Sequence, residues 1–175
     1  MLFRSLVTGA ASTQSATPVN YLSTLVWLGP DGTVKRQKIV GGGAVVRHSD
    51  GLCTCDSTYN IVPTPDGGFL LTGASSLGQG EGKLSPAHGG LDGWIVKVDS
   101  QGERLWDQSF GTSGYDLLSR ALPLPDGGFL LAGTAVSGQF LIWLIRIDSK
   151  GTVVWERTAT AAPPNQWVYF AEVVQ

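Results

Sequence analysis

Short runs of apolar and β-branched residues, each ended by Gly, Pro or Asp, alternate with polar turns along most of the chain. The clearest series is formed by residues 118–124, 129–133, 141–147 and 152–158. Runs of this length that end at turn residues are typical of β-strands, and no segment shows sustained helical periodicity. The pattern therefore predicts an all-β chain in which this series forms four antiparallel strands.

The turns between these runs have their own chemistry. Residues 125–128 read Pro-Asp-Gly-Gly and separate the first two runs. Proline fixes φ, aspartate can bond nearby backbone, and glycine accepts a positive φ, so a tight hairpin is predicted. Asp99 and Asp148 each begin a second kind of turn. We expect them to cap their own turns, because calcium needs six or more oxygen ligands.

The series is written twice. Residues 65–73 return at 125–133 with one change, and Trp-Ile-Val-Lys-Val-Asp-Ser-Gln-Gly at 94–102 returns at 143–151 as Trp-Leu-Ile-Arg-Ile-Asp-Ser-Lys-Gly. Lys97 is equivalent to Arg146, and we expect both side chains to cover apolar surface with their stems while their charges reach water. Such self-similarity indicates an array of units that bury their apolar faces against their neighbours.

These residues also carry a family resemblance. The segment Gly-Gly-Leu-Asp-Gly-Trp-Ile-Val-Lys-Val-Asp-Ser-Gln-Gly at 89–102, followed by Trp106 and by the repeated Pro-Asp-Gly-Gly, resembles β-propeller repeats of many secreted or surface bacterial proteins. The resemblance covers nearly the whole chain. It implies blades of four antiparallel strands that pack face to face around an axis. It also implies an extracellular or cell-surface location, but no particular reaction, since one fold serves many functions.

On this interpretation the chain is a single β-propeller-like domain. Residues 1–43 would form the last three strands of a blade, 58–110 and 115–160 two full blades, and 167–175 the first strand of a further or closing blade. About three blades are too few for a ring, since propellers have about 4 to 8. Two explanations stay open. The chain is part of a longer parent, or two copies associate through their terminal strands.

Composition narrows the possible partners. The net charge of −2 and the pI near 5.6 give no electrostatic reason to bind nucleic acid or an anionic membrane. The longest apolar run, near residues 140–145, is far shorter than the roughly 20 residues of a spanning helix, so no membrane span is expected. We expect a protein or carbohydrate ligand instead.

Function is expected at one end of the sheets. Alternating strand direction places both tight turns of a blade at one rim and both longer, variable connections at the other, where recognition usually occurs. The candidate binding residues in these connections are Arg47, His48, Asp50, His88, Asp92, Tyr115 and Trp167. The polar ones could equally be solvated loop residues, and the aromatic ones could pack between blades or stack on a sugar.

Candidate metal and catalytic groups are few. His48, Cys53, Cys55 and Asp56 lie together in an insertion, but the one-residue cysteine spacing is unlike that of zinc sites, so neither a metal nor a cofactor is predicted. His48 and His88 are the only histidines, and neither lies in a nucleophile motif. The sequence therefore predicts a non-catalytic binding or scaffold module. The alternatives are a lectin, or a carbohydrate-active enzyme if rim carboxylates such as Asp92 and Asp116 meet.

Overall fold

The computed structural model describes residues 5–12, 21–43, 56–76, 78 and 83–160 of the chain. Within these ranges every regular element is a β-strand, and every pairing within the three sheets is antiparallel. The all-β prediction is therefore confirmed. The described segments contain no helix that is long and apolar enough to cross a membrane.

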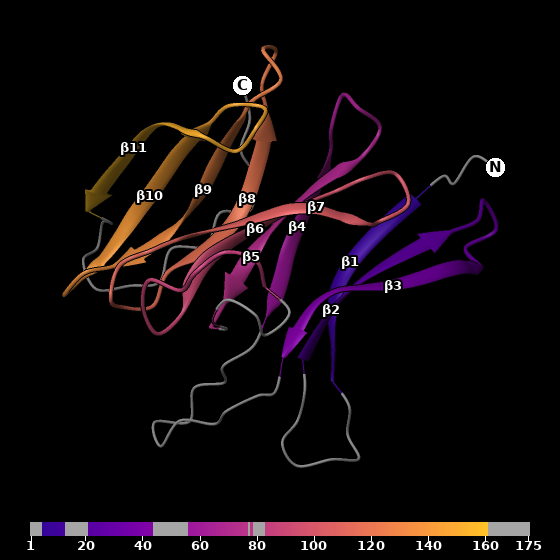
Figure 1. Cartoon of the computed structure of the whole chain (residues 1–175), viewed down its shortest axis with the longest axis horizontal. Coiled ribbons are helices and arrows are strands. Elements are labelled where there is room, and N and C mark those ends of the chain that lie inside the picture. The colour runs from indigo at the N-terminus through magenta and orange to yellow at the C-terminus, as the bar shows by residue number, and fades with distance from the viewer. Residues whose placement is uncertain (1–4, 13–20, 44–55, 77, 79–82, 161–175) are drawn as a thin grey trace.

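The strands form three sheets in chain order (Figure 1). The first sheet contains β1 (Ser5–Ser12), β2 (Tyr21–Leu28) and β3 (Val34–Gly43). The second contains β4 (Ser57–Pro63), β5 (Phe69–Ser75), β6 (Asp92–Val98) and β7 (Arg104–Phe110). The third contains β8 (Leu117–Pro123), β9 (Phe129–Val136), β10 (Phe140–Ile147) and β11 (Val153–Thr160).

The hairpin turns form as the sequence predicts. Gly67 and Gly127 adopt φ values of +80° and +83°, in the region that disfavours side chains with a Cβ atom. The Asp66 carboxylate accepts a hydrogen bond from the Gly68 amide at 3.0 Å, and Asp126 accepts one from Gly128 at 3.1 Å. Each aspartate therefore holds its own turn, as proposed from the Pro-Asp-Gly-Gly motif.

The second kind of turn is also capped by its own aspartate. Asp99 accepts hydrogen bonds from the amides of Gln101 and Glu103, both at 2.8 Å. Asp148 accepts the same pair of bonds from Lys150 and Thr152, again at 2.8 Å. The prediction that these aspartates cap their own turns is confirmed.

Successive sheets pack on each other in the same way. Strand β4 of the second sheet lies against β1 and β2 of the first, and β8 of the third sheet lies against β5 and β6 of the second. β8 also lies against β4, so the first strands of the second and third sheets are neighbours. The three sheets are consequently arranged side by side rather than joined into one continuous sheet (Figure 1).

The hydrophobic core consists of two layers between the sheets. Trp94 lies with Leu25 and Trp27 in the layer between the first and second sheets. Trp143 lies with Ile95 in the layer between the second and third sheets, and both side chains are buried. Along the middle strands β5 and β6, alternate side chains enter the two layers, so nearly every residue of these strands is buried.

The period-two pattern of residues 152–158 predicts that Trp155 is buried between sheets, and this prediction is wrong. Its side chain is only partly buried, and most of β11 is exposed. The equivalent Trp106 of the second sheet packs beneath Gly151 of the third. No sheet of the described chain lies over the corresponding face of β11, so Trp155 remains partly exposed.

Candidate functional site

The candidate residues fall into two groups. Arg47, His48, Asp50 and Trp167 lie outside the described residues, as does the predicted strand 167–175. His88, Asp92 and Tyr115 are described: the His88 amide donates to Asp92 at the start of β6, and Tyr115 pairs with the adjacent Leu91. The geometry of the site rests on this second group.

Two long connections are tied together at this end of the second sheet. The amides of Gly90 and Leu91 donate to the Gly114 carbonyl at 3.2 and 3.3 Å, and the Asp116 amide donates to the Leu91 carbonyl at 2.6 Å. Leu91 and Tyr115 form a parallel β-bridge. Residues 88–91 and 111–116 therefore form one surface, which we call the loop platform.

The buried side chain of Asp116 stabilises the loop platform. Its fully buried carboxylate accepts hydrogen bonds from the Thr112 amide at 2.5 Å, the Thr112 hydroxyl at 3.0 Å and the Val136 amide at 2.7 Å. Burial raises the pKa of this carboxyl above its usual value against the effect of these bonds, and the charge of Asp92 acts in the same direction as burial. The carboxylate thus joins the β7–β8 connection to the end of β9.

Asp92 has a similar structural role. It was proposed as a binding residue of the rim, but its side chain is fully buried at the start of β6. It accepts a hydrogen bond from the His88 amide at 2.7 Å, and its Oδ2 atom lies 3.9 Å from the Lys83 ammonium nitrogen. Asp92 therefore supports the backbone of the platform and offers no exposed charge.

Gly111 lies between the two carboxylates. A Cβ atom on this glycine would lie 2.7 Å from Asp92 Oδ1 and 2.9 Å from Asp116 Oδ2. The two oxygen atoms therefore cannot be farther apart than the sum of these distances. The two acids that the sequence left as a possible pair do approach each other, but both are enclosed beneath the loops.

Lys83 is a buried charged residue near the platform, and the sequence did not predict its burial. Its side chain is fully buried, and burial lowers the pKa of the ammonium against the attraction of Asp92, Asp56 and Asp107. The next two amides, of Leu84 and Ser85, donate to the Asp107 carboxylate at 2.8 Å each. The segment thus crosses β7 and holds the platform from the side. A lysine that directly follows a glycine-rich run gave no signal of burial.

The exposed part of the platform is small and mixed in character. His88 is exposed, and Tyr115 is partly buried. The Tyr115 ring lies over Gly90, since a Cβ atom on this glycine would be 3.5 Å from the ring. The tyrosine therefore packs against the neighbouring loop.

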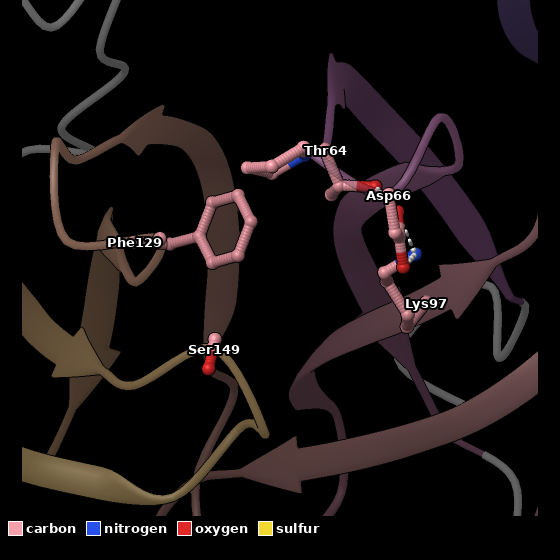
Figure 2. A pocket seen from close by; sticks show the side chains of 7 residues that line it. Thr64, Asp66, Lys97, Phe129 and Ser149 are labelled. Carbon is pink, nitrogen blue, oxygen red and sulfur yellow. Dashed lines mark hydrogen bonds and ion pairs between the residues drawn. The ribbon is translucent and has the colours of Figure 1, made fainter.

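The opposite end of the sheets carries a hollow that is open to solvent (Figure 2). The Phe129 ring lies on one side of it, and Asp66 and Lys97 lie on the other. The hollow is lined by Thr64, Pro65, Asp66, Lys97, Gly127, Phe129 and Ser149. It separates the first hairpin of the second sheet from the turns of the third.

The prediction that the Lys97 charge reaches water is wrong. Lys97 is 5% exposed, and its ammonium donates to Asp66 Oδ1 and to the Val98 carbonyl, both at 3.0 Å. The charge therefore does not reach water but closes the hairpin turn. Arg146 makes the equivalent ion pair with Asp126 in the third sheet. The hairpin aspartate, present in both repeats, was the available signal for these two pairs.

A metal site needs several His, Cys, Asp or Glu side chains close together. No cluster of three or more His, Cys, Asp or Glu side chains suited to a metal ion occurs among the residues that the structure describes. His48, Cys53 and Cys55 lie outside them, so the expectation that these residues and Asp56 hold no metal is not tested. No protein-family model matches the chain, and no curated protein is significantly similar to it.

Proposed function

We propose that the chain is a β-propeller-type binding module, without chemistry of its own, that presents the loop platform to a protein or carbohydrate ligand. The repeated packing of one sheet on the next supports the propeller interpretation. Each new sheet places its first strand against the same two strands of the sheet before it. A constant step of this kind is what successive blades require.

The observation that carries the binding proposal is the use of two buried carboxylates to fix exposed loops. Asp92 and Asp116 together accept hydrogen bonds from the backbone of His88, Thr112 and Val136. The platform is consequently ordered before any ligand arrives. A preformed surface avoids the entropic cost of ordering loops on binding.

The same observation argues against the glycosidase alternative at this site. Glycosidases need two carboxyl groups that flank a sugar, with room for a water molecule in the inverting class. The carboxylates of Asp92 and Asp116 are fully buried, and most of their oxygen atoms already accept hydrogen bonds from the loops. A lectin remains compatible with the partly exposed Tyr115, and it belongs to the class of binding modules. The proposed location outside the cytoplasm follows from the family resemblance alone.

An array of defined oligosaccharides and a panel of aryl glycosides test this function. We expect no hydrolysis of the glycosides. Binding to any oligosaccharide should weaken in His88→Ala and Tyr115→Ser and persist in Gln101→Ala and Lys150→Ala, which alter the opposite end of the sheets. Hydrolysis that disappears in Asp92→Asn and Asp116→Asn would replace the binding module with an enzyme. Ligand binding that only the opposite-end variants weaken would move the site away from the platform.

A further inference from the structure

Both contacts between sheets place a turn glycine on a tryptophan ring. A Cβ atom on Gly102 of the second sheet would lie 2.6 Å from Trp27 Cη2 of the first sheet. A Cβ atom on Gly151 of the third sheet would lie 3.0 Å from Trp106 Cη2 of the second. These positions have φ values of +73° and +90°, so glycine suits both the turn and the close approach.

The two outermost sheets each hold one half of a third such contact. Gly32 of the first sheet is equivalent to Gly102 in sequence, and it has a φ of +76°. No described atom lies within 4 Å of a Cβ atom built on Gly32. Trp155 of the third sheet is equivalent to Trp106, and it is partly exposed. Among the described residues, the first sheet therefore has no tryptophan beneath this glycine, and the third sheet has no glycine above this tryptophan.

The outer face of the third sheet resembles the face of the second sheet that the third sheet covers. Leu130 and Leu144 point away from the second sheet, because their neighbours along β9 and β10 form the core between the sheets. Both leucines are only partly buried. Their counterparts in the second sheet, Leu70 and Ile95, are 0% exposed beneath the third sheet. The repeat thus preserves apolar residues on a face that no described sheet covers.

The outer face of the first sheet is apolar as well. Val26 and Leu28 alternate with the buried Leu25 and Trp27, so they point away from the second sheet. Their counterparts Val96, Val98, Ile145 and Ile147 are all fully buried. Val34 and Ile39 lie opposite Leu28 and Thr24 on the same face and are 53% and 57% exposed. A contiguous apolar surface of this kind favours association with another protein surface.

The two outer faces also carry charges of opposite sign. Between the first and second sheets, Lys38 pairs with Glu103 of the adjoining turn. Arg157 is the sequence counterpart of Lys38, and Thr33 is the counterpart of Glu103. The Thr33 hydroxyl donates to the Asp31 carboxylate at 2.7 Å. If the third sheet packed on a first sheet in the established manner, Arg157 would face Thr33 and the adjacent Asp31 carboxylate. The contact would therefore combine an apolar centre with opposite charges at its rim.

We propose that the outer face of the third sheet binds the outer face of the first sheet in a second copy of this chain, with Trp155 seated on Gly32. The same patch is not used by both partners, so the contact is head to tail. Two copies can make two such contacts and close. Together they supply six sheets, which lies within the about 4 to 8 blades of propellers. This assembly goes beyond the proposed binding function and requires no ligand.

The mass of the full chain in solution, measured by light scattering over a range of protein concentrations, tests the assembly. We expect the wild-type mass to be twice that of one 18.5 kDa chain. Trp155→Glu on the third sheet and Ile39→Glu on the first should each reduce it to the mass of one chain. Arg157→Glu, an exposed substitution that removes no apolar surface, should shift dissociation to higher protein concentration.

Two substitutions serve as controls. Val154→Glu alters the neighbour of Trp155 at the register irregularity of β11, and Leu105→Glu alters its counterpart in the second sheet, which stays 52% exposed although the third sheet packs on that sheet. Both variants should keep the doubled mass, and circular dichroism should show that all five variants are folded. A wild-type chain that is monomeric at every concentration would overturn the proposal. So would a dimer that survives both Trp155→Glu and Ile39→Glu, because its interface must lie elsewhere.

Discussion

The guanidinium carbon of Arg36 lies 4.8 Å from the centroid of the Trp27 ring, and the two residues face each other across β2 and β3. At the same positions of the second sheet, Lys97 on β6 faces Trp106 on β7. The cation and the ring have therefore exchanged strands in the first sheet while the cross-strand pair is kept. A tryptophan remains available to the turn glycine of the next sheet in both arrangements.

Arg36→Ala should lower the free energy of unfolding by about 1 kcal/mol, because it removes a cation–π contact of about 0.5–1 kcal/mol. It also removes the 2.9 Å hydrogen bond that Arg36 donates to Gln101 of the second sheet. Urea denaturation would measure the loss. Lys35→Ala, an exposed change in the same strand, is the matched control and should have little effect. Equal midpoints for the two variants would contradict a role for the Arg36 contacts.

Gly133 and Gly127 should respond differently to alanine. A Cβ atom on Gly133 would lie 1.9 Å from the Leu117 carbonyl oxygen, so Gly133→Ala must displace backbone and should cost several kcal/mol, about 3 or more. A Cβ atom on Gly127 would meet only Ser149, at 3.7 Å, and the cost there comes from its φ of +83°. We expect about 1 kcal/mol for Gly127→Ala.

Asparagine separates these two causes. Gly127→Asn should be milder than Gly127→Ala, since asparagine tolerates a positive φ, whereas Gly133→Asn should be as damaging as Gly133→Ala. Thermal unfolding of the four variants measures the order. A milder effect of Gly133→Asn would show that backbone conformation, and not the Leu117 carbonyl, explains this glycine. The sequence also predicts that Gly127→Val is more damaging than Gly80→Val, because Gly127 lies in a hairpin, but Gly80 lies outside the described residues.

Asp66→Asn should change how stability depends on pH. The pKa of Asp66 lies well below its usual value because the Thr64 hydroxyl, the Lys97 ammonium and the Gly68 amide donate to its carboxylate. The native state therefore binds fewer protons than the unfolded state below about pH 4. The stabilisation by Asp66 is complete above that pH and is lost as the pH falls towards the lowered pKa.

At neutral pH Asp66→Asn should lose about 1–2 kcal/mol, since Asp66 is largely exposed and its charge is screened while the buried Lys97 loses its counter-ion. The difference in free energy of unfolding between Asp66→Asn and the wild type should become smaller under acid conditions. Asp126→Asn is the matched variant, and it should lose less because Arg146 is more exposed than Lys97. If the difference in free energy of unfolding between Asp66→Asn and the wild type stayed the same from pH 7 to about pH 2, this linkage would be excluded.

Lys83→Met should destabilise the chain by about 3 kcal/mol, although methionine is apolar and fits a buried position. Removal of the ammonium leaves the buried carboxylate of Asp92 without the positive charge 3.9 Å away. Lys150→Met, in an exposed turn, is the control and should be nearly neutral. Urea midpoints measure both. A Lys83→Met variant as stable as the wild type would mean that the ammonium only fills space.

The repeated features of the fold could be predicted from the sequence because they depend on local chemistry. The hairpin at residues 125–128, the caps formed by Asp99 and Asp148, and the alternation that buries Trp143 each follow from residues that are close in the chain. Two copies of each feature also provided an internal check. The strand set of the third sheet was predicted to within a few residues.

The remaining features depend on contacts between distant segments. The burial of Asp92 requires two loops to close over it, and the fate of Lys97 depends on an aspartate in another turn. Trp155 occupies a position that predicts burial, but its exposure depends on whether another sheet lies over it. A single sequence shows the residues that make these contacts, but it does not show which of them meet in the fold.

The side chains that order the loop platform are buried, whereas the residues that form its surface are exposed. Asp92 and Asp116 hold the backbone from the interior, whereas Pro86, Ala87 and Ser113 are exposed beside it. Exposed positions of this kind can be randomised in a library without removing the groups that order the loops. The platform is therefore a natural place to select new specificities on an unchanged scaffold.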